Sequence, residues 1–92
     1  MPNVTAVSIK TSDGAAKSGP GVVYWVAVSA GATGGAFQLN DSTDDSGTDM
    51  RNITVAATTT QFFDFTGAVI NFGTGIYVDV PGTNLTVNVG YA

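Results

Sequence analysis

The chain has 92 residues, of which only three are basic and seven acidic, giving a formal net charge of −4. It contains no cysteine and no histidine. These counts exclude a disulfide framework and thiolate or imidazole metal sites, and so few cations argue against nucleic-acid binding, which needs several residues that neutralise phosphates.

The length predicts a single domain spanning residues 1–92. A domain of this size buries only about 60% of its unfolded surface, and association with other proteins is a common further source of stability. Charged residues make up 11% of the chain, well below the roughly 25% of a typical soluble protein. We therefore expect a surface suited to contact with other protein.

The N-terminal region predicts a strand followed by a connector. Residues 3–10 are rich in β-branched side chains, which favour a strand. Residues 11–21 (TSDGAAKSGPG) have the composition of a flexible connector. The first 20 residues are thus expected to form an N-terminal strand and a flexible segment ahead of the rest of the domain.

Residues 22–29 (VVYWVAVS) form the most apolar stretch. Their β-branched and aromatic content, with glycines at both ends, favours a central strand over a buried helix. The inward face is expected to be Val22, Tyr24, Val26 and Val28. Val23, Trp25 and Ala27 would then point outward, and we take Val23 and Trp25 as candidate contacts for a partner protein.

The middle of the chain predicts three more short strands, at residues 36–39, 50–57 and 61–65. A glycine-rich loop at 31–35 precedes the first of them, and a polar loop at 40–49 (NDSTDDSGTD) follows it. The residues expected to mark these strands are Phe37 and Leu39, both facing inward, Ile53 and Val55 as anchors, and the aromatic residues Phe62, Phe63 and Phe65.

Residues 68–91 alternate strictly between apolar and polar side chains, which predicts strands at 68–72, 76–80 and 85–91. The connections at 73–75 and 81–84 have common hairpin lengths, so we expect a meander in which each strand pairs with the next. Its buried side is expected to be Ile70, Phe72, Ile76, Val78, Val80, Leu85, Val87 and Val89.

About eight short strands and no convincing helix predict an all-β fold, a jelly-roll-like antiparallel β-sandwich. Groups for catalysis are scarce, because a serine or threonine nucleophile needs a neighbouring base, usually histidine, and the chain has no histidine. Asp45-Ser46-Gly47 matches the D-[ST]-G triplet of dimeric aspartic proteases, but it lies in a polar loop and not after an apolar strand, which favours a solvated turn. We expect no enzymatic activity and no cofactor.

Two groups of side chains leave ligand binding open as an alternative. The acidic residues of the polar loop could hold Ca²⁺, although their spacing is not that of an EF-hand, and a surface loop without an ion is the favoured reading. These residues are Asp41, Asp44, Asp45 and Asp49. Trp25 with Tyr24 could stack on a sugar ring, but a single tryptophan in an apolar run is more typical of a core or an interface.

The pattern GIYVDV at 75–80, GTN at 82–84 and VNVGY at 87–91 resembles a group of small β-rich virion proteins of tailed bacteriophages. The segments GPGVVY at 19–24 and FQLND at 37–41 fit the same pattern, so the resemblance extends from about residue 17 to the C-terminus. It implies a jelly-roll-like fold, no enzymatic activity and a place on the virion, most often as a capsid decoration (cement) protein. Similar folds occur in tail and neck components.

For such a protein we expect a homotrimer that binds the major capsid protein, because decoration proteins bridge capsomers and a closed three-fold ring suits such positions. The N-terminal strand is expected to lie against a neighbouring subunit. We expect no small-molecule ligand and no nucleic acid as partner.

Residues 22–28 are too short an apolar run to span a membrane as a helix, and no signal peptide is visible, so synthesis in the host cytoplasm is expected. The alternatives are a carbohydrate-binding or host-recognition module, a small tail or neck component, and a domain of a longer fibre protein. The Met1 start and the complete final strand favour a whole chain over a fragment.

Overall fold

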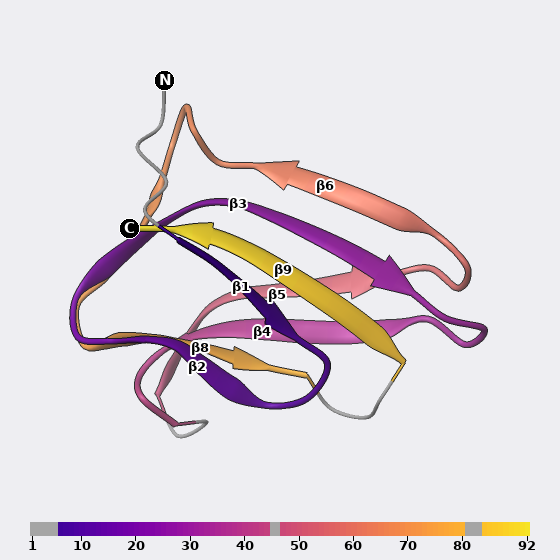
Figure 1. The fold of residues 1–92 in the computed structure, drawn as a ribbon, viewed down its shortest axis with the longest axis horizontal. Coiled ribbons are helices and arrows are strands. Elements are labelled where there is room, and N and C mark those ends of the chain that lie inside the picture. Colours follow the sequence, from indigo (N-terminus) through magenta and orange to yellow (C-terminus); the bar gives the residue numbers. More distant parts are fainter. Residues whose placement is uncertain (1–5, 45–46, 81–83) are drawn as a thin grey trace.

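The computed structural model describes residues 6–44, 47–80 and 84–92, which form nine β-strands and no helix (Figure 1). The all-β class is confirmed. The strands are β1 (Ala6–Lys10), β2 (Gly14–Ser18), β3 (Gly21–Ala30), β4 (Gly35–Asp41), β5 (Thr48–Val55), β6 (Thr60–Asp64), β7 (Ile70–Phe72), β8 (Gly75–Asp79) and β9 (Leu85–Tyr91).

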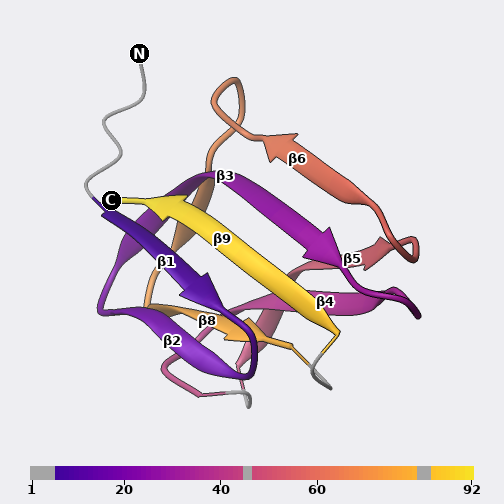
Figure 2. The ribbon, with the colours of Figure 1, turned by 45° about the vertical axis from the view of Figure 1, so that its right-hand side comes forward.

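The strands form two antiparallel sheets, which we call sheet A and sheet B (Figures 1 and 2). Sheet A has the order β1-β9-β3-β6, with β7 also paired to β3, and sheet B has the order β2-β8-β4-β5. The pairs β1–β9, β2–β8, β3–β6 and β4–β5 are nested in the sequence, each enclosing the next, and they alternate between sheet A and sheet B. This connectivity is that of a jelly roll, as the sequence predicts.

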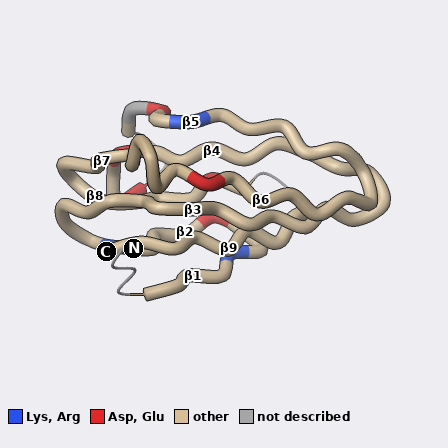
Figure 3. Tube along the Cα trace, turned by 90° about the horizontal axis from the view of Figure 1, so that it is seen from above, with Lys and Arg blue, Asp and Glu red and all other residues tan. Residues whose placement is uncertain are grey.

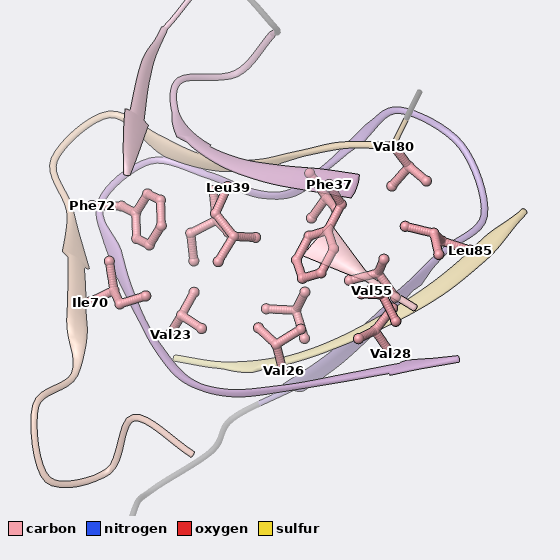
Figure 4. Close-up of a cluster of buried hydrophobic side chains, with 14 residues drawn as sticks. Val23, Val26, Val28, Phe37, Leu39, Val55, Ile70, Phe72, Val80 and Leu85 are labelled. Carbon is pink, nitrogen blue, oxygen red and sulfur yellow. The ribbon is translucent and has the colours of Figure 1, made fainter. Parts of the chain in front are cut away.

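The core lies between the inner faces of the two sheets (Figure 4). Among the described residues it consists of 14 buried apolar side chains. Phe37 and Leu39 of β4 are fully buried in it, and so are Val26 and Val28 of β3. All eight residues predicted for the buried side of the C-terminal third belong to this core, so their burial is confirmed.

The predicted C-terminal meander is wrong in its pairing. β7 pairs with β3 in sheet A, β8 pairs with β2 and β4 in sheet B, and β9 returns to sheet A between β1 and β3. Alternation shows that one face of a strand is buried, but both inner faces of a sandwich are buried, so the same pattern suits successive strands in different sheets. The connection at 73–75 therefore crosses between the sheets, and residues 81–83 of the second predicted turn lie outside the described residues.

The predicted flexible connector at 11–21 is also wrong, because it contains β2. This strand pairs with β8, with an extra residue, Ala16, bulging between Ala15 and Lys17. Just before β2, the Asp13 carboxylate accepts a hydrogen bond from the Val80 amide at 2.7 Å. A partner about 60 residues away thus orders a segment whose small residues have little strand propensity of their own.

The inward face of β3 differs from the expected one. The pairing with β9 shifts between Val23 and Trp25, so Tyr24 is an extra residue on β3. A bulge reverses the alternation on one side of it. Val23 therefore faces the core with 0% exposure, and it is not available as a partner contact. Trp25 and Ala27 lie on the outer face, as predicted.

The remaining strands lie close to their predicted positions. β4 continues through Asp41, and β5 begins at Thr48, so the predicted polar loop is shorter than residues 40–49. β5 ends at Val55, two residues before the predicted end. For the predicted strand at 3–10, the structure describes the part from Ala6 onward.

Candidate functional site: the outer face of sheet A

Strand register aligns outward-pointing residues of sheet A in two rows that cross all four main strands. Residues paired across neighbouring antiparallel strands point to the same side of the sheet. One row is Val7, Gly90, Trp25 and Asp64, and the next is Ile9, Asn88, Ala27 and Phe62. Valines before and after Ala27 are buried in the core, so these two rows form the outer face.

The large exposed hydrophobic side chains of the described residues all lie in these rows. They are Val7 (53% exposed), Ile9 (65%) and Phe62 (62%). We call Val7, Ile9, Trp25, Ala27 and Phe62 the apolar face. Scattered exposed apolar residues are ordinary in soluble proteins, but their gathering on one side of one sheet is typical of an interaction site.

Trp25 occupies the centre of the apolar face in a defined position. Its indole lies over Gly90, where a Cβ atom would collide with the ring. The Phe62 ring lies beside it, with centroids 5.8 Å apart and planes tilted by 32°. Gly90 is therefore required for the indole to lie close to the sheet, and the two rings form a continuous aromatic surface.

Polar groups border the apolar face. The Ser29 and Thr60 hydroxyl oxygens, in the next row of the sheet, are 3.3 Å apart. Asn88 lies inside the face, between Ile9 and Ala27, and its side-chain amide donates to the Ala27 carbonyl at 3.3 Å. Asp64 supplies a carboxylate at the other end of β6, where a 2.9 Å hydrogen bond from the Thr66 amide lowers its pKa. An apolar centre with a polar rim is the usual composition of a protein–protein interface.

Charges are few over the whole described fold (Figure 3). Among the acidic residues of the predicted polar loop, Asp41 contacts backbone amide groups. The Asp41 carboxylate accepts hydrogen bonds from the amides of Gly73 (3.0 Å), Thr74 (2.7 Å) and Gly75 (3.3 Å). Chiefly the Thr74 and Gly73 amides lower the pKa of Asp41. This carboxylate thus fastens the connection between β7 and β8, a role that no local sequence signal indicates.

Asp44 and Asp49, the other described acidic residues of the predicted polar loop, have separate surroundings. The Asp44 carboxylate accepts a 3.0 Å hydrogen bond from the Ser42 hydroxyl, and Asp49 is exposed on β5. Among the described residues, no three side chains of the metal-binding types lie close enough together to hold an ion. Asp45 and Ser46, which belong to the protease-like triplet, lie outside the described residues.

Comparison of the chain with protein-family models, with curated proteins and with solved structures finds no match. In the part of the chain that the structure describes, there is no helix of the length and hydropathy that crossing a membrane requires. The candidate site is therefore characterised by its own residues: an aromatic centre on β3 and β6, two apolar edges and a polar border.

Proposed function

We propose that this chain is a non-enzymatic structural protein that attaches to other protein through the outer face of sheet A. More specifically, we propose a capsid decoration protein on the virion of a tailed bacteriophage, made in the host cytoplasm, which binds the major capsid protein and copies of itself. The observation that carries this proposal is the gathering of Val7, Ile9 and Phe62, all more than half exposed, on one side of one sheet.

The composition of the face supports attachment to protein. Aromatic side chains in the centre of a patch are the usual anchors of protein interfaces. The absence of a side chain at Gly90 lets the Trp25 indole lie against the sheet at this centre. The jelly roll is a fold used in viral capsid domains, which is an argument from analogy. A small charge-poor domain also gains stability when such a face is covered.

The self-associated form in this proposal is a homotrimer. Contacts between unlike surfaces of identical copies form closed rings when the rotation between copies permits closure, and a three-fold ring suits the three-fold positions of a shell. A tail or neck component would use the same face with a different partner.

The second candidate is carbohydrate binding or host recognition. It is favoured by the adjacent rings of Trp25 and Phe62, since aromatic surfaces stack on sugar rings and lectin domains share the jelly roll. The two candidates differ in their readout. A glycan ligand would change the fluorescence of Trp25, the chain's single tryptophan, without changing the mass of the protein in solution.

The test combines the mass of the protein in solution, measured by light scattering, with binding to undecorated shells of the phage whose genome encodes it. We expect an oligomer that binds the shells. Trp25→Ala should weaken assembly by more than about 1 kcal/mol, as the loss of an aromatic anchor does. Thr54→Ala, on the exposed side of β5 in sheet B, is the matched control and should assemble normally.

Two results would discard the proposal. One is a monomer at every concentration that does not bind the shells. The other is a Trp25→Ala protein that is folded by circular dichroism and assembles and binds as the unmodified protein does. Saturable binding of a glycan by the monomer would establish the second candidate instead.

A further inference from the structure

We infer that the two open edges of sheet A pair with each other between copies, so that β1 of one copy lies as an added strand beside β6 of the next. The inference rests on the proposed self-association and names its geometry. Figure 2 shows β1 and β6 at opposite sides of sheet A.

The four edge strands of the sandwich are not equally protected. Open edges of soluble proteins usually carry charges or bulges that prevent pairing with another strand. In sheet B, β2 carries Lys17 and a bulge at Ala16, and β5 carries Asp49 and Arg51 with a bulge between them at Met50. Both edges of sheet B are therefore blunted.

The edges of sheet A lack this protection. β1 pairs with β9, and β6 pairs with β3, without any register shift. Each is a regular five-residue strand with one charged residue at its end, Lys10 or Asp64. Each also presents a large apolar side chain that is more than half exposed. Regular apolar edges of this kind are templates for strand addition.

The directions of the two strands fit such a contact. Every neighbouring pair across β1, β9, β3 and β6 is antiparallel, so β1 and β6 run in opposite directions. A neighbour's β6 placed beside β1 therefore continues the antiparallel alternation of the sheet. Antiparallel strands can then share main-chain hydrogen bonds along the whole contact.

One register matches the side chains of the two edges on both faces. With Val7 opposite Phe62 of the next copy, Ile9 lies opposite Thr60 on the outer face. Ser8 then lies opposite Gln61 on the inner face. Pairs of β-branched and aromatic residues and pairs of polar residues are the favourable cross-strand combinations.

Pairing of unlike edges also explains why both edges are apolar. A two-fold contact between two β1 strands would leave Phe62 exposed, and one between two β6 strands would leave Val7 and Ile9 exposed. The head-to-tail contact gives each of the three a neighbouring side chain from the next copy with a single kind of interface. It also joins the apolar faces of successive copies, and such contacts close into a ring when the rotation between copies permits it.

Cysteine cross-linking tests this geometry, because the chain has no cysteine of its own. Val7→Cys and Phe62→Cys proteins, one of them carrying a mass tag, are mixed, dissociated, reassociated and oxidised under mild conditions. We expect disulfides between the two different variants and none within either variant alone. A mixture of Val7→Cys with Thr54→Cys, whose cysteine would lie on sheet B, should form none.

A charge placed on the edge gives a second measurement. Val7→Lys should raise the dissociation constant of the oligomer at least ten-fold, whereas Thr54→Lys should leave it unchanged. Disulfides between two copies of V7C would show like-edge pairing and overturn the inference. An oligomer of normal mass that yields no V7C–F62C link, and that Val7→Lys leaves intact, would overturn it while the proposed function stood. A monomer at all concentrations would overturn the inference, and a monomer that also failed to bind the shells would overturn the proposed function with it.

Discussion

Gly90 sets the position of Trp25 through its missing side chain. A Cβ at this position would collide with the indole. Gly90→Ala should therefore displace the ring and destabilise the fold by about 1–3 kcal/mol, the usual range for an inserted methyl group in a packed site. Urea unfolding followed by the fluorescence of Trp25 measures both the stability and the ring's environment.

Gly67→Ala is the matched control for this experiment, since a Cβ there would meet nothing within 4 Å. Its effect should lie within about 0.5 kcal/mol. Equal effects of the two substitutions, with unchanged fluorescence of the folded Gly90→Ala protein, would show that the glycine is not needed for the indole.

Asp41 links the stability of the fold to pH. The amides of Thr74 and Gly73 lower its pKa from the usual 3.8, so the folded state favours the charged carboxylate. A group with a lowered folded pKa contributes stability above its unfolded pKa and loses it as the pH falls through the folded value. Asp41→Asn should therefore be less stable than the unmodified protein at neutral pH, and the difference should shrink below pH 3.8.

The measurement is the urea midpoint of both proteins across this pH range. Asp49→Asn removes the same charge from an exposed position on β5 and controls for net charge. A difference between Asp41→Asn and the unmodified protein that stayed constant down to the lowest pH would mean that the carboxylate's ionisation does not contribute.

At the scale of the strand, alternation predicted burial but not pairing. The eight apolar residues of the C-terminal third are all buried, yet their strands belong alternately to sheets A and B. The bulge at Tyr24 places Val23 on the opposite face from the predicted one. The bulge arises from the pairing of β3 with β9, which the sequence of β3 alone does not indicate. The residues of β2 have little strand propensity, and the strand forms because it pairs with β8.

The candidate site was predicted only at its centre. Alternation along residues 22–29 predicts that Trp25 points outward. Val7, Ile9 and Phe62 belong to the site because they lie on edge strands of the same sheet, which local sequence does not indicate. Strand order depends on contacts between distant segments, such as β1 with β9. The β-branched residues Val7 and Ile9 predict a strand, but not which side of that strand is covered.

The contribution of β4 to the core can be tested with two phenylalanines. Phe37 is fully buried between the sheets, and Phe62 is mostly exposed. Phe37→Ala should cost about 3–5 kcal/mol of unfolding free energy, a large part of the total for a domain of this size. Phe62→Ala should cost less than about 1 kcal/mol in dilute monomer. Urea midpoints measure both, and similar losses would contradict the assignment of the two faces.

At the scale of the whole molecule, the jelly roll brings the first and last described strands into sheet A. β1 and β9 pair along their length, so the first and last described strands lie side by side (Figure 1). β1, one edge of the proposed interface, is therefore held in the sheet by its pairing with β9, which closes the fold. Covering that edge with another copy should stabilise the folded chain itself, because binding to the native state alone shifts the unfolding equilibrium.

This coupling predicts that stability depends on protein concentration. The urea midpoint of the unmodified protein should rise over about a hundred-fold increase in concentration, because the oligomer contains only folded chains. The midpoint of Val7→Lys should stay constant over the same range, since Val7 is 53% exposed and its replacement affects assembly more than folding. Unfolding followed by circular dichroism at each concentration provides the comparison. A midpoint of the unmodified protein that does not move with concentration would mean that the copies gain no folding stability from one another.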